Sequence, residues 1–252
     1  MIPLRDDVPA SRTPIVTRAL VLACTAVFVL QLGDATGDLV ERFGMVPARV
    51  LDPDSTHLVR GSFGRVVGRI DAAAVPDWFT LLTCTFLHGG WMHFLGNMLF
   101  LWIFGDNVED RFGRLPFLLF YVACGVAASA AHLLAGPDST IPTIGASGAI
   151  AGVMGAYLLL YPRARVQMLV VWGFFVDLVV LPAPFFLGYW FLLQLLGTAV
   201  ERGQGGGVAW WAHIGGFVAG ALVAAMLRAV GALRPDQPRV VLARHRYRRP
   251  GW

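Results

Sequence analysis

The stretch GASGAIAGVMGAYLLLYP occupies residues 145–162 and contains no charged side chain. Working outward from it, three further windows also lack charge: 78–105, 178–200 and 203–227. Each window approaches or exceeds the roughly 20 residues that an α-helix needs to cross a bilayer. The sequence therefore predicts a membrane protein with several spans.

The composition supports this prediction. Hydrophobic residues make up 56% of the 252 residues before glycine is counted, and charged residues make up 14%. Soluble globular chains average about 45–50% apolar residues with glycine included and about 25% charged residues. The mean hydropathy is +0.63. About six spans of ~20 residues with their loops use up the chain, which leaves no room for a separate soluble domain.

We therefore predict an all-α polytopic membrane protein built as a bundle of six transmembrane helices. A cytoplasmic N-terminal segment (1–18) precedes the six-span domain (19–230), and an arginine-rich cytoplasmic tail (231–252) follows it. The expected spans are 19–33, 89–105, 116–136, 147–161, about 182–200 and 208–230.

The segments between the spans are expected to differ in kind. Residues 34–77 carry both signs of charge and several prolines, which predicts a large, membrane-associated first loop, and 78–88 has an amphipathic pattern that suits the interface. The charged stretch 106–114 is expected to be a short loop. Residues 166–181 are expected to lie in the interface, and a seventh span within 166–181 is the alternative.

Arginine placement predicts the orientation. All 20 basic residues are arginine, and six of them follow the last apolar run. Six crossings place both termini and the loops after the second and fourth spans on one side, which the positive-inside rule makes cytoplasmic. The net charge of +4 is thus explained by membrane anchoring, and no nucleic-acid partner is expected. We expect an integral protein of a bacterial inner membrane.

Four polar residues lie where polar groups are expensive. His93 and Asn97 are one helical turn apart in the second span, Ser147 opens the fourth span, and His213 lies near the start of the sixth. At ~1.5 Å per residue, His93, Ser147 and His213 fall within roughly 10 Å of the outer boundary, so the four polar groups share one depth in one leaflet. Polar side chains inside a bilayer usually face the bundle interior or a water-filled cavity, so they are candidates for a functional site.

The chemistry that such a set supports is acyl transfer. A serine hydroxyl becomes a good nucleophile when an adjacent base takes its proton, and histidine is the usual base. Ser147 and His213 suit these roles, while Asn97, His93 and the Ser147 backbone N–H could stabilise an oxyanion. The fourth and sixth spans contain no acidic residue. We therefore expect a Ser/His dyad, with the histidine oriented by packing or by a backbone contact.

Glycine spacing predicts close contact between the helices that carry this pair. Gly148 and Gly152 in the fourth span, and Gly216 and Gly220 in the sixth, are small-xxx-small pairs. The simpler interpretation is that the serine bonds its own helix and that the histidines and asparagine join helices. A metal site at His88 and His93 is not favoured, because five-residue spacing does not place both rings on one helical face.

The sequence also resembles the rhomboid family of intramembrane serine proteases. The resemblance lies in three stretches: HGGWMHFLGNMLFLWIFGDNVED (88–110), GASGAIAGVMGAY (145–157) and AHIGGFVAG (212–220). It implies that Gly145, Ser147 and Gly148 form the nucleophile motif, that His213 is the general base and that His93 and Asn97 stabilise the oxyanion. It implies structural roles for His88 and Glu109.

The resemblance implies a rhomboid-like six-span bundle with a large first loop, acting on transmembrane protein substrates in the lipid bilayer without cofactor or metal. Two positions depart from the family pattern. Phe79 follows Trp78 where the family often has arginine, and Ala151 stands where some members have an aromatic ring. These differences put the stability of the first loop and the orientation of the base in question.

Two other functions are compatible with the sequence. The first is a non-proteolytic rhomboid-like protein that binds transmembrane clients. The second is a small transporter, which is disfavoured because the polar residues cluster in one leaflet and the two halves show no inverted repeat. No feature of the sequence indicates an oligomeric state.

Overall fold

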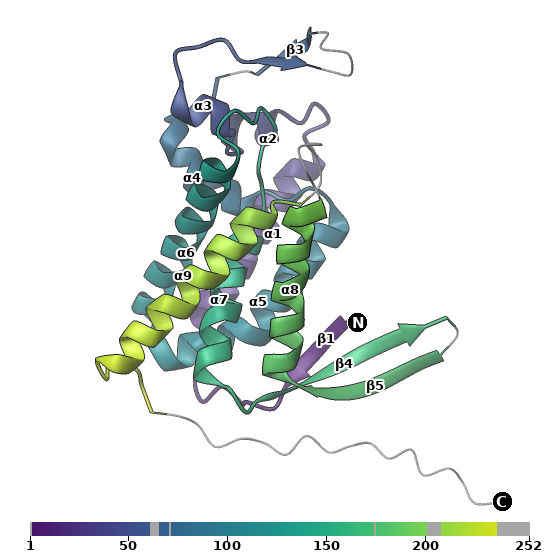
Figure 1. Cartoon of the computed structure of the whole chain (residues 1–252), viewed down its shortest axis with the longest axis vertical. Helices are drawn as coiled ribbons and strands as arrows, with labels where there is room; N and C mark the ends of the chain where they lie inside the picture. Colours follow the sequence, from purple (N-terminus) through teal and green to yellow (C-terminus); the bar gives the residue numbers. More distant parts are fainter. Residues whose placement is uncertain (1, 61–65, 71, 174, 201–207, 236–252) are drawn as a thin grey trace, which may run out of the picture.

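The computed structural model describes the chain except residues 1, 61–65, 71, 174, 201–207 and 236–252. Six long helices form the body of the molecule (Figure 1): α1 Ile15–Leu32, α5 Trp91–Phe112, α6 Arg114–Ala135, α7 Ser147–Leu160, α8 Ala183–Val200 and α9 Trp210–Ala229. Short helical turns precede α5: α2 Asp38–Phe43, α3 Pro47–Leu51, η2 Asp77–Phe79, α4 Thr80–Thr83 and η3 Cys84–Phe86. Five strands complete the described chain: β1 Ile2–Asp6, β2 Leu58–Arg60, β3 Val66–Arg69, β4 Arg165–Trp172 and β5 Phe175–Pro182.

The helices have the properties of a membrane bundle. By length and hydropathy, α1, α6, α8 and α9 could each cross a membrane, and α7 is a shorter apolar helix. Large apolar side chains such as Leu22, Leu30, Leu196 and Leu222 are exposed on these helices. Such a surface suits contact with lipid acyl chains. The mostly helical membrane class predicted from the sequence is confirmed, and the chain is an integral membrane protein.

Helix α7 lies at the centre of the bundle, in contact with α5, α6, α8 and α9. Every residue from Gly148 to Tyr157 is buried. A Cβ atom added at Gly216 would lie 2.0 Å from the Gly148 carbonyl oxygen, and one added at Gly220 would lie 2.0 Å from that of Gly152. Helices α7 and α9 therefore pack backbone against backbone at these glycine pairs.

The predicted loop at 106–114 is wrong, because α5 continues to Phe112. Glu109 and Asp110 of this stretch are buried and have partners from the N-terminal segment. The Glu109 carboxylate accepts hydrogen bonds from the backbone N–H of Val16 (3.0 Å) and from the N–H and hydroxyl of Thr17 (both 2.8 Å). Glu109 thus binds the otherwise unpaired donors at the start of α1. The chain turns into α6 at Gly113, whose φ of +88° favours glycine.

The described residues of 166–181 form strands and not a helical seventh span, while their expected place in the interface stays a prediction. They belong to an antiparallel hairpin, β4–β5. Strand β1 pairs with the other edge of β4, which gives a sheet of order β1-β4-β5. The sheet lies at the opposite end of the bundle from the first loop (Figure 1). Val166 and Met168 are fully buried in the core of the bundle. A hairpin cannot cross a bilayer alone, because its edges leave backbone groups unpaired.

The sheet is attached to the bundle through Asp6. Its carboxylate accepts hydrogen bonds from the Asn107 amide (2.6 Å) and the Tyr157 hydroxyl (2.5 Å). Burial raises the pKa of the Asp6 carboxyl to about 6. The N-terminal segment, predicted as a cytoplasmic extension over 1–18, therefore supplies a strand and, from Ile15, the first turn of α1. Most of the predicted tail, 231–252, lies outside the described residues.

The first loop is held by a buried arginine. Arg49 is 3% exposed, donates to the carbonyl oxygens of Glu41 (2.8 Å) and Gly44 (2.9 Å), and forms an ion pair with Asp77 (2.6 Å). Asp77 begins η2, the turn that contains Phe79. Arg49 of α3 thus joins the first loop to η2, the turn in which Phe79 stands where the resemblance suggests an arginine.

Candidate active site

Ser147 is the first residue of α7 and follows a tightly constrained turn. Gly145 has a φ of +124°, and a Cβ atom there would lie 2.7 Å from two ring atoms of His93. The turn is attached to the segment before α5, since the Gly145 N–H donates to the Cys84 carbonyl (2.8 Å). Thr143 pairs with Met45 of the first loop. Glycine is thus required at 145 by both conformation and space.

Ser147 and His213 are in direct contact. The Ser147 Oγ and His213 Nε2 atoms are 2.7 Å apart, although the residues are 66 positions apart in sequence. His213 is 9% exposed and lies at the start of α9. The contact places a hydroxyl beside a ring nitrogen that can take its proton.

The residue on the side of the histidine ring opposite Ser147 was not predicted from the sequence. His213 Nδ1 lies 2.7 Å from Oε1 of Gln194, a buried residue of α8. The sequence led us to expect packing or a backbone contact to orient His213, and the structure adds this side-chain amide. One signal was available: Gln194 is the only side-chain amide in the charge-free window 178–200.

Aromatic rings also surround the histidine. The Trp190 ring centroid lies 5.6 Å and the Trp210 centroid 6.5 Å from that of His213. Ala151 stands at the position where some members of the family that the sequence resembles have an aromatic ring, and it is fully buried in α7. The rings beside His213 therefore come from α8 and α9.

His93 and Asn97 lie on α5, and the His93 ring lies beside this turn. The Gly89 N–H donates to His93 Nδ1 (3.2 Å), so the neutral ring carries its proton on Nε2. The Cβ position of Gly145 is 2.7 Å from His93 Nε2 and 3.6 Å from Ser147 Oγ, which places both atoms around the same turn. The Asn97 Nδ2 atom is buried and has no hydrogen-bond partner within the described residues. The His93 Nε2–H donor therefore lies near the serine, and the approach of the Asn97 amide to Ser147 stays a prediction.

His88 has a different environment. It is 2% exposed, and its ring packs against Phe28 and Phe94 with centroid distances of 6.3 and 5.3 Å. Its backbone N–H and carbonyl both bond the side-chain amide of Gln31, at 2.9 and 3.1 Å. His88 thus joins α1 to the start of α5. Over the described part of the chain, no group of three His, Cys, Asp or Glu side chains could hold a metal ion.

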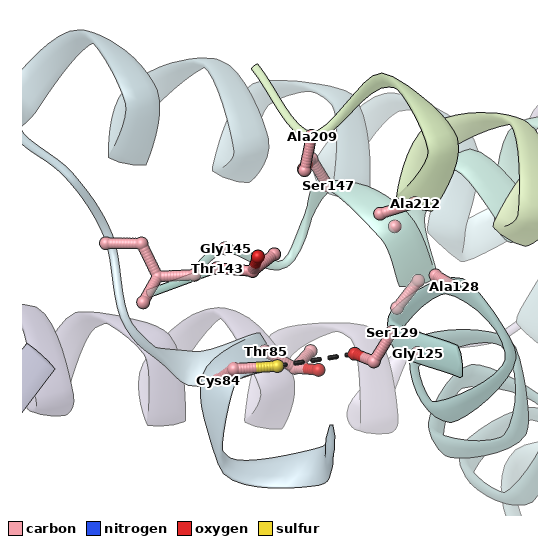
Figure 2. Close-up of a pocket in the computed structure, with 13 residues that line it drawn as sticks. Cys84, Thr85, Gly125, Ala128, Ser129, Thr143, Gly145, Ser147, Ala209 and Ala212 are labelled. Atoms are coloured by element: carbon pink, nitrogen blue, oxygen red, sulfur yellow. Dashed lines mark hydrogen bonds between the residues drawn. The ribbon is translucent and has the colours of Figure 1, made fainter. Parts of the chain in front are cut away.

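A small pocket lies next to Ser147 (Figure 2). Its wall includes the polar atoms of Cys84 and Ser129, whose sulfur and oxygen are 3.4 Å apart, and small side chains such as Ala128 and Ala212. Figure 2 shows these residues around one space, with Ala128 and Ser129 on α6, Cys84 in η3 and Ala212 on α9. Such a space beside a candidate nucleophile suits a small group of a bound molecule.

These observations define a class: a polytopic helical membrane protein with a serine–histidine pair where three helices meet. The rhomboid domain family matches residues 75–230, which include Ser147, His213, His93 and Asn97. The chain belongs to the rhomboid family.

Several relatives are similar in sequence to this chain. RHOMBOID-like protein 4 of Arabidopsis thaliana is 30% identical over 82% of this chain and 51% of its own length. Rhomboid protease GluP of Bacillus subtilis (strain 168) is 35% identical over 61% of this chain and 27% of its own length. Rhomboid protein 1, mitochondrial, of Saccharomyces cerevisiae is 30% identical over 59% of this chain and 41% of its own length. The chain thus matches between about a quarter and a half of these relatives.

Proposed function

We propose that this protein is an intramembrane serine endopeptidase that cleaves peptide bonds in or near the transmembrane segments of membrane-protein substrates. The observation that carries the proposal is the 2.7 Å contact between Ser147 Oγ and His213 Nε2. Family membership and the protease named among the relatives support the same activity. The reaction needs no cofactor, because nucleophile, base and oxyanion donors are all side-chain or backbone groups.

In the first half-reaction, Ser147 Oγ attacks the carbonyl carbon of the scissile bond while His213 Nε2 takes the hydroxyl proton. The negative charge that develops on the carbonyl oxygen is stabilised by the Asn97 amide, the His93 Nε2–H and the Ser147 backbone N–H. The C–N bond then breaks, and the proton passes from His213 to the leaving amine. An ester on Ser147 and a free amine-terminated fragment result.

In the second half-reaction, a water molecule attacks the ester carbonyl and His213 takes a proton from it. The bond from carbon to Ser147 Oγ breaks, the proton returns to the serine, and a carboxyl-terminated fragment leaves. Water must therefore reach Ser147. The position of the serine at the first residue of α7, beneath the first loop, supports access from that end of the bundle.

Arginine placement supports an orientation. Four arginines lie at the sheet end of the bundle: Arg111 and Arg114 at the α5–α6 turn, Arg163 just before β4, and Arg165 at its first residue. The positive-inside rule makes this end cytoplasmic, so both termini are cytoplasmic and Ser147 opens to the extracytoplasmic side of the membrane. The first loop and α8 then flank the path by which a substrate helix reaches the serine laterally.

Labelling with a fluorophosphonate serine probe tests this function without knowledge of the substrate. We expect the purified protein in detergent to be labelled, and both the Ser147→Ala and His213→Ala variants to remain unlabelled. A wild-type protein that stays unlabelled, beside an active relative that labels under the same conditions, would contradict the proposal. The non-proteolytic, client-binding function would then explain the polar cluster better.

A further inference from the structure

Gln194 lies where the third residue of a catalytic triad lies, on the side of the histidine ring opposite the serine. It is 5% exposed, and its Oε1 atom lies 2.7 Å from His213 Nδ1. The opposite ring nitrogen, Nε2, lies 2.7 Å from Ser147 Oγ. A continuous chain of hydrogen bonds therefore joins α8, α9 and α7 through the imidazole.

The direction of this chain follows from a second bond. The Nε2 atom of Gln194 donates to the carbonyl oxygen of Trp190, one turn earlier on the same helix, at 2.8 Å. A carbonyl oxygen only accepts, so the amide nitrogen must face Trp190 and the amide oxygen must face His213. Because the amide oxygen also only accepts, His213 Nδ1 must carry a hydrogen. The lone pair of the neutral ring is then on Nε2, facing the serine hydroxyl.

This arrangement supplies what a general base needs. A histidine held as its Nδ1–H tautomer presents an acceptor to the nucleophile, whereas the other tautomer presents a donor and cannot take the proton. In triads with aspartate, the carboxylate holds the imidazole in this tautomer and orientation. The amide of Gln194 performs the same orientation without adding a charge inside the bilayer, where an ionised side chain is costly.

Gln194 also joins the C-terminal half of α8 to the site. The buried residues of α8 are Ala183, Phe186 and Leu187 near its start, and then Gln194 alone. The neighbouring Leu192, Leu193, Leu195 and Leu196 are exposed. The polar bond from Gln194 to His213 joins this half to α9 beside the packing of Phe191 on Phe217 and of Trp210 against Gly197, and an outward movement of α8 would break it.

We propose that Gln194 is a positioning residue that fixes the Nδ1–H tautomer of His213 and makes the competence of the base depend on the position of α8. The proposal rests on the proposed peptidase function for its catalytic consequence, but the tautomer of His213 is a property of the protein at rest. The two can therefore be tested separately.

The first measurement is the rate of fluorophosphonate labelling in three variants. Gln194→Met has nearly the same shape but accepts no hydrogen bond from Nδ1. We expect labelling to slow by about 10- to 100-fold, up to the lower end of the roughly 10²- to 10⁴-fold that general-base catalysis contributes. Gln194→Glu keeps an acceptor at the same reach, and we expect most of the wild-type rate. Leu195→Met places the same new side chain on the exposed neighbour and should label like wild type. Thermal unfolding of all variants verifies folding.

The second measurement is the ¹⁵N NMR spectrum of histidine-labelled protein in lipid, with the His213 signals assigned by their loss in His213→Ala. We expect the Nδ1–H tautomer in wild type and in Gln194→Glu, and a shift toward Nε2–H in Gln194→Met. A wild-type Nε2–H tautomer, or a Gln194→Met variant with unchanged tautomer or unchanged labelling rate, would overturn the proposal. If the tautomer behaves as expected while the wild type takes up no probe, the positioning role stands and the peptidase function fails.

Discussion

The contact between α7 and α9 predicts that a single added methyl group at Gly216 will disable the site. Gly216 lies three residues after His213, on the helix that carries the base. A Cβ atom there would lie 2.0 Å from the Gly148 carbonyl oxygen and 2.9 Å from its carbonyl carbon, whereas ordinary van der Waals contact begins near 3.4 Å. Both obstructing atoms belong to the backbone of a buried helix, so a rotamer change cannot relieve the overlap.

The size of the effect follows from these distances. Relieving the overlap requires the helices to separate locally by about 1.4 Å, the shortfall between the 2.0 Å approach and normal contact. The Ser147–His213 distance of 2.7 Å would then exceed hydrogen-bonding range if it shared most of that movement. A misplacement of about 1 Å costs an enzyme roughly 10²-fold in rate. Overpacking of a well-packed interior costs about 1–3 kcal/mol of stability.

We therefore expect Gly216→Ala to label with the fluorophosphonate probe at least about 10²-fold more slowly than wild type, with a lower melting temperature in detergent. The matched control is Gly188→Ala on α8, where an added Cβ atom meets nothing within 4 Å. This variant should label and melt like wild type. A Gly216→Ala protein that labels within twofold of wild type would refute the packing argument, because the helices would have absorbed the methyl group without displacing the base.

Three further predictions concern the support of the site. Glu109→Ala removes the acceptor for three donors at the start of α1, so we expect roughly 2–4 kcal/mol lower stability. Detergent melting checks this, and an unchanged melting temperature would show that water replaces the carboxylate. Arg49→Met leaves the Asp77 carboxylate without its cation, and losing a buried pair costs about 3 kcal/mol. Limited proteolysis should then cut the first loop faster than in wild type, and equal cleavage rates would argue against this role. For Asp6, the pKa raised from 3.8 to about 6 means that the fold favours the protonated form. Its stabilising contribution is present below about pH 4 and lost as the pH rises through 6, up to about 3 kcal/mol. Asp6→Asn should therefore flatten the pH dependence of melting between pH 4.5 and 8, and identical profiles would exclude Asp6 as its source.

Local sequence patterns predicted the helices well, because a bilayer imposes a simple rule on length and polarity. The stretch at 145–162 became α7, and the expected spans at 116–136 and 208–230 agree with α6 and α9 within a few residues. The pattern failed at 106–114. The charged residues there indicated a loop. The partners of Glu109 and Asp110, however, lie about 90 to 100 residues away in the N-terminal segment, so no local window explains why this stretch is helical.

The sheet escaped prediction for a related reason. The stretch 165–182 is apolar without a turn signal stronger than one glycine, Gly173, and a short apolar run does not distinguish strand from helix. Its pairing with β1 depends on residues more than 150 positions earlier in the chain. A backbone hydrogen bond between such distant segments carries no signature in either segment alone.

For the site itself, the sequence determined which residue types are present and predicted that they share one depth in the membrane. Ser147, His213, His93 and Asn97 were identified from polarity within apolar spans and from their spacing. The tertiary structure decided how these groups meet: the hydroxyl 2.7 Å from the imidazole, the tautomer that Gln194 requires, and the backbone contact that Gly216 permits. Helical periodicity specifies the direction of a side chain relative to its own helix, whereas contacts between helices depend on how the helices rotate and pack against one another.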